Sequence, residues 1–202
     1  MGIPDRPAPS RRHFILSAGA AIAASGCTNV PSIDAIDIDR FRLPDNGAAR
    51  IDARVDAARD FLFARYPGMA ELEARSSGQL YMPLITEVGL GFGGSYGTGA
   101  LRVGGATVDY FAAFSASTGF QAGAQQFSHA LFFMTPEALG NFRVRRGWSV
   151  GGDVHYAVLD GGGGLSATTL QVLDPVIAVI YAQAGLKAGV SLEGTFYQRI
   201  AP

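Results

Sequence analysis

Residues 88–123 read VGLGFGGSYGTGALRVGGATVDYFAAFSASTGFQAG, and this glycine-rich stretch decides the fold class. Gly89, Gly91 and Gly93 recur at every second position, so in an extended chain they lie on one face of the strand. A strand face without side chains permits close approach by another backbone or by a ligand. The stretch therefore predicts a tightly packed β architecture.

The composition limits the classes of function. The chain has 202 residues, of which 48% are hydrophobic and 16% are charged. A chain of this length and apolar content buries one core, so we expect a single folded domain. Its 16 basic and 17 acidic residues nearly cancel. Because no global positive field is available to hold phosphates, a nucleic-acid partner is not expected.

The amino terminus has the pattern of an export signal. Arg11 and Arg12 precede Phe14 and an apolar run rich in alanine and glycine that ends at Gly26. Paired arginines followed by an aromatic residue are typical of a twin-arginine signal. The run is too short to span the roughly 30 Å hydrocarbon core of a bilayer. We therefore expect residues 1–26 to be a twin-arginine-type signal peptide.

Cys27 is the only cysteine, and it follows Ala24-Ser25-Gly26 in the pattern of a lipobox, where the cysteine is acylated and the preceding bond is cut. A secretory signal with an incidental cysteine is the alternative. Residues 27–46 are rich in proline and aspartate and predict a lipidated flexible tether, and residues 47–202 form the domain. These signals predict a lipid-anchored lipoprotein on the periplasmic face of a bacterial cell envelope, and Thr28 after the cysteine favours the outer membrane.

Two helices are expected at the start of the domain. From residue 48 to 66, apolar side chains recur at helical spacing before Pro67 and Gly68, and residues 69–75 predict a short second helix. The polar face of the first helix carries four arginines and three aspartates that largely neutralise one another. We interpret it as a solvated face, with a lipid-headgroup role as the alternative.

Strands are expected from Gln79 onward, with turns at Gly104-Gly105 and at residues 161–164. The alternation in residues 186–200 predicts a strand with Phe196 in the core and Tyr197 on the polar face. Gly194 predicts a bulge or bend in that strand.

One helix is expected within the sheet region, from Pro136 to Arg143, with Thr135 as its N-cap. The predicted fold class is α+β, in which the N-terminal amphipathic helices precede a strongly curved, nearly closed and mainly antiparallel β-sheet with this one short inserted helix.

Six runs of the sequence resemble the SYLF domain, the lipid-binding module also known from the Ysc84 actin-associated proteins. In the family's own order, the runs are GFGGSYGTGALRVGG (91–105), ASTGFQAGAQ (116–125), FFMTPEAL (132–139), GWSVGGD (147–153), PVIAVIYAQAGLKAGVSLEGT (175–195) and a terminal Arg199-Ile200. The resemblance implies a non-catalytic domain that binds membrane phospholipid and needs no cofactor. Actin is not expected as a partner, because the chain has no SH3 domain and carries an export signal. A structural or partner-binding role with another envelope protein is the alternative.

The densest positive cluster is Arg143, Arg145 and Arg146, close to Trp148. Guanidinium groups bind phosphate well and an indole favours the membrane interface, so these residues are the candidate site for an anionic lipid headgroup. A solvated turn after a helix is the alternative interpretation. Further candidates with a positive side chain in family-like runs are Arg102 and Lys187.

Two short motifs invite a nucleotide-binding or catalytic interpretation. Residues 89–94 satisfy G-x-G-x-x-G, with Asp109 twenty residues beyond Gly89, but a dinucleotide site requires a helix to begin at the last glycine. Residues 93–97 satisfy G-x-S-x-G, which would make Ser95 a nucleophile only on a strand-to-helix turn. Because the strand pattern continues through both, nucleotide binding is not expected and a small serine hydrolase using Ser95 is a remote alternative.

The histidines indicate neither a metal site nor a catalytic general base. His129 and His155 are not paired at ligand spacing, so no metal is expected. His129 lies among Phe127, Leu131 and Phe133 and is interpreted as a core residue. The hydrolase alternative would need partners for Ser95 from a set of imidazoles and carboxylates: His129, His155, Asp109, Asp153 and Asp160.

Overall fold

The computed structural model describes residues 47–145, 147–150, 154–159, 174–185, 192 and 194–202, all of which belong to one compact unit, Leu43–Pro202. Several predictions lie outside these residues: the export signal with Arg11, Arg12 and Phe14, the lipidation site Cys27, the tether, the turn at residues 161–164, Arg146 and Lys187.

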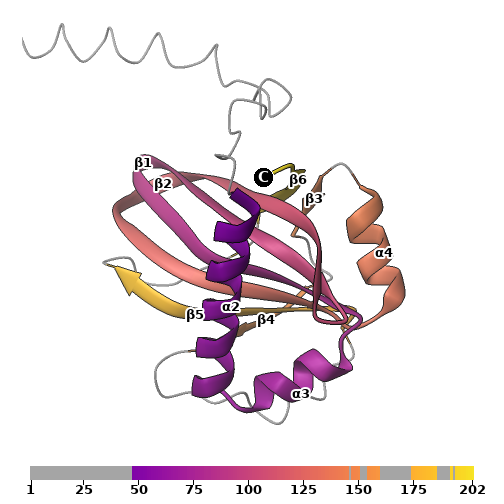
Figure 1. Ribbon diagram of the computed structural model, residues 1–202. Helices are drawn as coiled ribbons and strands as arrows, with labels where there is room; N and C mark the ends of the chain where they lie inside the picture. Colours follow the sequence, from indigo (N-terminus) through magenta and orange to yellow (C-terminus); the bar gives the residue numbers. More distant parts are fainter. Residues whose placement is uncertain (1–46, 146, 151–153, 160–173, 186–191, 193) are drawn as a thin grey trace, which may run out of the picture. The chain divides into compact units, whose positions relative to one another are not determined.

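Two helices begin the described part of the chain, as the apolar spacing predicts. Helix α2 spans Gly47–Arg65 and buries Ile51, Val55 and Leu62 on one face. Helix α3 spans Gly68–Arg75 and buries Met69 and Leu72. Pro67 separates the two helices, since a proline cannot continue the hydrogen-bond ladder of the first. Figure 1 shows α2 lying across one face of the sheet.

Strands β1 (Gly78–Val103) and β2 (Ala106–Phe133) form one long antiparallel hairpin. Gly104 and Gly105 make its turn with φ angles of 59° and 84°, which is the left-handed region that two-residue hairpin turns require. The turn predicted there is confirmed. Three register shifts interrupt the pairing of the strands, and such irregularities let a ribbon bend.

Strand β2 is the centre of a six-stranded sheet in the order β3-β6-β2-β5-β4, with β1 also paired to β2. The shorter strands are β3 (Trp148–Ser149), β4 (Val154–Val158), β5 (Val176–Gly185) and β6 (Phe196–Ile200). Among the described strands, only β4 and β5 pair in parallel. The sheet is therefore mainly antiparallel and curled (Figure 1), which confirms the predicted α+β class with leading helices and one inserted helix.

Both faces of the sheet are apolar, because neighbouring residues of a strand point to opposite sides. Ala130 and Phe132 of β2 belong to the core under α2 and α3. Leu131 and Phe133 of the same strand belong to a second core, which includes Phe142 of the inserted helix. The helices α2 and α4 therefore cover opposite faces of the sheet.

The curl brings the two halves of β1 against each other at glycines. A Cβ atom on Gly97 would overlap the carbonyl oxygen of Leu84, and one on Gly99 would overlap the carbonyl oxygen of Tyr81. Both glycines lie an even number of residues from Gly93 along the strand, with Ser95 between Gly93 and Gly97. The backbone therefore approaches closely at Gly97 and Gly99, whereas the approach predicted at Gly89, Gly91 and Gly93 stays a prediction.

Helix α4 spans Pro136–Val144 and begins as predicted. The Thr135 hydroxyl accepts a hydrogen bond from the backbone N–H of Ala138 at 3.1 Å, and Pro136 occupies the first turn, where its missing N–H costs nothing. Phe142 is the buried residue of this helix.

Replacing Thr135 with alanine should lower the free energy of unfolding by about 1 kcal/mol, because it leaves a helix N–H without its acceptor. Urea unfolding at pH 7 would measure the change. Thr135→Ser is the matched control and should retain most of the stability, since serine keeps the hydroxyl. Equal losses in both variants would mean that the methyl group, and not the cap, stabilises this turn.

The prediction for the last strand needs correction. Residues 192, 194 and 195 are not in a strand, Gly194 lies in a turn with φ 75°, and β6 begins only at Phe196. Within β6 the expected faces are reversed, since Tyr197 is fully buried and Phe196 is only partly buried. The turn restarts the alternation, and the Tyr197 hydroxyl finds a buried partner in His129 at 2.6 Å. A polar tip with such a partner permits burial of a tyrosine.

Candidate functional site

Aromatic packing holds α4 in place. The Phe142 ring lies 4.7 Å from the ring of Phe111, 4.8 Å from that of Phe133 and 5.5 Å from that of Trp148. These distances are typical of favourable aromatic pairs. Because Phe142 is anchored, the residues that follow it at the end of α4 are held at one corner of the sheet.

Asp109 of β2 joins two arginines at that corner. Its Oδ2 lies 3.2 Å from Nε of Arg143, and its Oδ1 lies 3.3 Å from Nε of Arg199. Arg199 also donates from Nη2 to the backbone carbonyl of Arg143 at 2.8 Å, which places a cation at the negative end of α4. We call Asp109, Arg143, Arg145 and Arg199 the arginine corner.

Strand pairing explains how Arg199 reaches the corner. It pairs with Phe111 across β2 and β6, and Asp109 lies two residues before Phe111 on the same face. Diagonal neighbours of this kind in an antiparallel sheet are within reach of a long side chain. The pairing joins segments that are far apart in the sequence.

The corner is open to solvent, although its acid is not. The side chains of Arg143 and Arg199 are 43% and 49% exposed, and that of Asp109 is 13% exposed. Arg145 follows α4 directly and is exposed, and Val144 is 80% exposed. Three arginines and one aspartate therefore leave two net positive charges beside an exposed apolar side chain.

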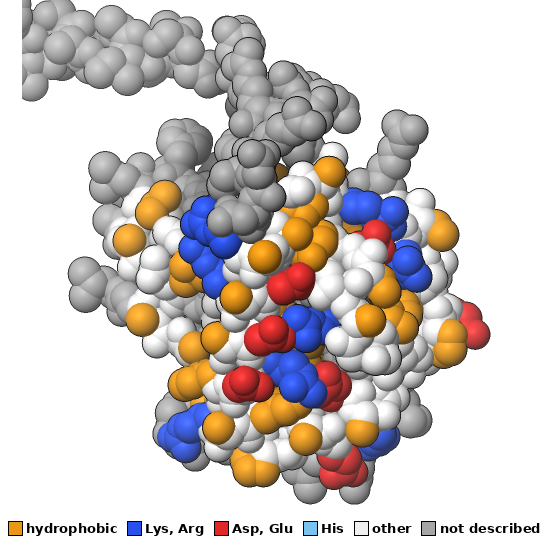
Figure 2. Space-filling view, viewed as in Figure 1, with side chains coloured by type: hydrophobic (Ala, Val, Ile, Leu, Met, Phe, Trp, Pro, Cys, Tyr) orange, Lys and Arg blue, Asp and Glu red, His pale blue; other side chains and the backbone are white. Residues whose placement is uncertain are grey.

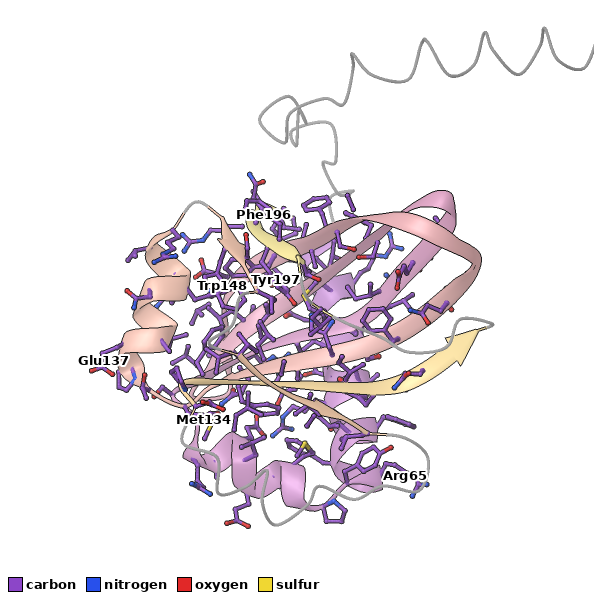
Figure 3. The ribbon with its side chains drawn as sticks, turned by 180° about the vertical axis from the view of Figure 1, so that it is seen from behind. Arg65, Met134, Glu137, Trp148, Phe196 and Tyr197 are labelled. Carbon is purple, nitrogen blue, oxygen red and sulfur yellow. The ribbon has the colours of Figure 1, made fainter. Side chains whose placement is uncertain are left out.

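Trp148 is half-buried and contacts the core more than the solvent. Its indole lies 5.8 Å from the Tyr197 ring as well as 5.5 Å from that of Phe142. Figure 3 shows Trp148 and Tyr197 together beside α4. Trp148 thus packs against Phe142 and Tyr197 and helps to hold α4, which carries Arg143, in place.

Arg102 lies apart from the corner, on the face that α2 covers. Its Nη2 is 2.7 Å from Asp56 and 3.9 Å from Asp52, and the side chain is 14% exposed. Asp52 also accepts hydrogen bonds from Thr107 and Tyr110, both at 2.8 Å. This network attaches α2 to the hairpin. In Figure 2, positive and negative side chains lie close together on the side of the molecule where α2 lies.

A cleft of about 510 Å³ lies between α2, α3 and the hairpin turn. Its lining residues are Arg59, Phe63, Ala70, Glu73, Ala74, Ser76, Gln79, Gly104 and Gly105. Arg59 donates to both Glu73 oxygens at 3.0 and 2.8 Å and lies over the Phe63 ring at 4.5 Å. The hydrogen bond to Glu73 raises the pKa of Arg59. The charges of this cleft therefore compensate each other.

Of the residues that a hydrolase would need, Ser95, His129 and Asp109 are described, and each makes other contacts. The Ser95 hydroxyl lies in β1 and hydrogen-bonds to the Ser115 hydroxyl at 2.7 Å. His129 hydrogen-bonds to Tyr197, and Asp109 pairs with arginines. The side chain of His155 and the whole of Asp153 and Asp160 lie outside the described residues. Residues 89–97 are strand throughout, so neither glycine motif opens the helix that its chemistry requires.

His129 is fully buried, and burial lowers its pKa to about 3. Its Nε2 hydrogen-bonds to Tyr197, whereas its Nδ1 has no hydrogen-bond partner within the described part of the chain. The imidazole is consequently neutral at physiological pH, which agrees with its interpretation as a core residue.

Neither a metal cluster nor a membrane-spanning helix is found in the part of the chain that the structure describes. No group of three or more histidine, cysteine, aspartate or glutamate side chains there could hold an ion. No described helix is both long enough and apolar enough to cross a bilayer.

The fold and the corner define an α+β domain with an exposed cationic surface at the end of its inserted helix. Residues 114–200 match the family model described as Ysc84: Las17-binding protein actin regulator. Residues 114–200 therefore match the Ysc84 (SYLF) domain family, which confirms the resemblance seen in the sequence over this region. A comparison with the curated proteins finds no match. The matched region contains Arg143, Arg145 and Arg199, whereas Asp109 precedes it.

The sequence places Arg143, Arg145 and Trp148 in one region but does not indicate Asp109 and Arg199 as neighbours of Arg143. From the sequence, Asp109 is a candidate only as a ribose-binding or catalytic acid, and Arg199 is noted only in the terminal run that resembles the family. The one sequence pattern that indicates the position of Asp109 is the two-residue period of a strand, which places Asp109 and Phe111 on the same face. No local pattern indicates that Arg199 pairs beside it.

Proposed function

We propose that this protein is an exported, lipid-anchored lipoprotein whose SYLF domain contacts anionic phospholipid through the arginine corner and performs no covalent chemistry. The observation that carries the proposal is the exposed cluster of Arg143, Arg145 and Arg199 within a region that matches a family of lipid-binding type. The anchor is Cys27, and the location is the periplasmic face of the envelope, with the outer membrane favoured.

The chemistry of the corner supports a membrane surface as its ligand. Guanidinium groups bind phosphate oxygens through paired N–H donors, and each basic residue near an anionic membrane contributes about 1 kcal/mol. Val144 lies between Arg143 and Arg145 and is 80% exposed, so it can enter the interface while the cations meet the headgroups. Apolar insertion and charge attraction would then act at the same place.

The family description names an actin regulator, and actin is not part of the proposal, because the export signal would separate the two proteins. A protein partner in the envelope is the alternative ligand of the corner. Binding to purified vesicles distinguishes the alternatives, since a protein-specific surface needs no lipid charge.

Neutralising the corner should weaken vesicle binding. We expect the double variant Arg143→Gln with Arg145→Gln to bind phosphatidylglycerol vesicles at least about tenfold more weakly, because two cations near the surface are lost. Co-sedimentation of the full chain, with Cys27→Ala in every sample so that no acyl group attaches, would measure the affinity.

The matched control removes two exposed arginines of α2, Arg50 and Arg54, and should leave the affinity close to that of the parent chain. Phosphatidylcholine vesicles and added salt are further controls, because charge-driven binding requires anionic lipid and is screened by ions. Equal losses of affinity in both double variants would mean that binding depends on the net charge of the protein and not on the arginine corner. Absence of binding to anionic vesicles would favour the protein-partner alternative.

A further inference from the structure

Asp109 occupies an unusual place for an acid within a phosphate-binding surface. It lies beneath Arg143 and Arg199, is less exposed than either, and contacts both guanidinium groups through Nε. Of the remaining guanidinium donors, Nη2 of Arg199 bonds to a backbone carbonyl, and the Nη groups of Arg143 make no hydrogen bond within the described residues. The acid therefore orients the cations while it cancels part of their charge.

We propose that Asp109 is an internal anion that sets how negatively charged a membrane must be before the arginine corner binds it. This inference rests on the proposed function, and its ligand is an anionic phospholipid surface. With Asp109 charged, the corner carries two net positive charges; without that charge it would carry three. The carboxylate lowers the net positive charge that these two guanidinium groups present to a membrane phosphate.

Removing the negative charge of Asp109 should therefore strengthen binding to an anionic membrane. Asp109→Asn keeps the size of the side chain and one acceptor oxygen for an arginine, but removes the negative charge. Affinity for phosphatidylglycerol vesicles should rise about fivefold, as expected for one additional positive charge at the surface. Half-maximal binding should also require a smaller fraction of anionic lipid.

The test is a co-sedimentation titration of the full Cys27→Ala chain on vesicles that contain increasing fractions of phosphatidylglycerol in phosphatidylcholine. Asp60→Asn is the matched control, because Asp60 is exposed on α2 and the substitution changes the net charge equally on the opposite face. Thermal unfolding of each variant reports whether the fold is retained. The gain should be specific to Asp109→Asn and should disappear in high salt.

The outcomes separate the inference from the proposed function. If the parent chain binds anionic vesicles and Asp109→Asn binds equally or more weakly, Asp109 serves only to hold the corner together and the inference is wrong. If Asp60→Asn gives the same gain, charge at a distance is sufficient and the inference is also wrong. If the parent chain does not bind, the proposed function fails, and the inference survives only if Asp109→Asn binds.

Discussion

Gly99→Ala is expected to destabilise the domain by about 3 kcal/mol, which is a large part of the stability of a typical single domain. The added Cβ atom would overlap the carbonyl oxygen of Tyr81 and crowd the sulfur of Met82. A methionine side chain can move, but the carbonyl belongs to the backbone of a strand paired along its length with β2. The two halves of β1 would have to separate, which opens the core between them.

Urea unfolding at pH 7 would measure the loss, with circular dichroism as the signal. Gly140→Ala is the control, since a Cβ atom there meets nothing within 4 Å and alanine favours the helix by about 0.5–1 kcal/mol. The control should raise the midpoint while Gly99→Ala lowers it. A Gly99→Ala protein as stable as the parent would show that the curl of β1 does not depend on this contact.

Acid is expected to unfold the domain partly through His129. Its pKa is about 3 when folded, against an ordinary value of 6.5, because burial disfavours the charged ring. As the pH falls, His129 therefore takes up a proton at a higher pH in the unfolded chain than in the folded chain. Between pH 6.5 and pH 3 the free energy of unfolding should fall by about 1.4 kcal/mol for each unit that the pH is lowered, in addition to the contribution of the carboxylates.

Removing the imidazole should remove this contribution. The double variant His129→Leu with Tyr197→Phe deletes both partners of the buried hydrogen bond, so it leaves neither of them unsatisfied in that contact. Denaturant unfolding at pH 7, 6, 5 and 4 should give a shallower dependence on pH than the parent chain shows. Tyr197→Phe alone keeps the titrating group and should keep the steep dependence. Parallel curves for all three proteins would refute the assignment to His129.

Local signals predicted most of the elements. The helical spacing before Pro67 specified α2, the pair Gly104-Gly105 specified the hairpin turn, and Thr135 with Pro136 specified the start of α4. Each of these signals acts within a few residues, through side-chain spacing, a left-handed backbone or a cap. The prediction for the last strand was wrong because the turn at Gly194 shifts the alternation of buried and exposed residues. No local pattern indicates which face of the strand Tyr197 would take.

The candidate site was only partly visible in the sequence. Arg143 and Arg145 are close in the chain, so a cluster could be read directly. Arg102 has the same charge and lies in a family-like run, yet it is bound to Asp56 on the other face of the sheet. Contacts between residues separated by long loops depend on strand register, which no short pattern encodes.

The sequence by itself determined the type and order of the elements and the glycine-bearing face of β1, because these follow from backbone preference and from the period of a strand. Tertiary structure alone decided that this face meets the carbonyl oxygens of Tyr81 and Leu84, that His129 and Tyr197 share a buried hydrogen bond, and that Asp109 lies between two arginines. The reason is physical. Such contacts exist only after the curled sheet has closed, when burial and strand register bring distant side chains within a few ångströms.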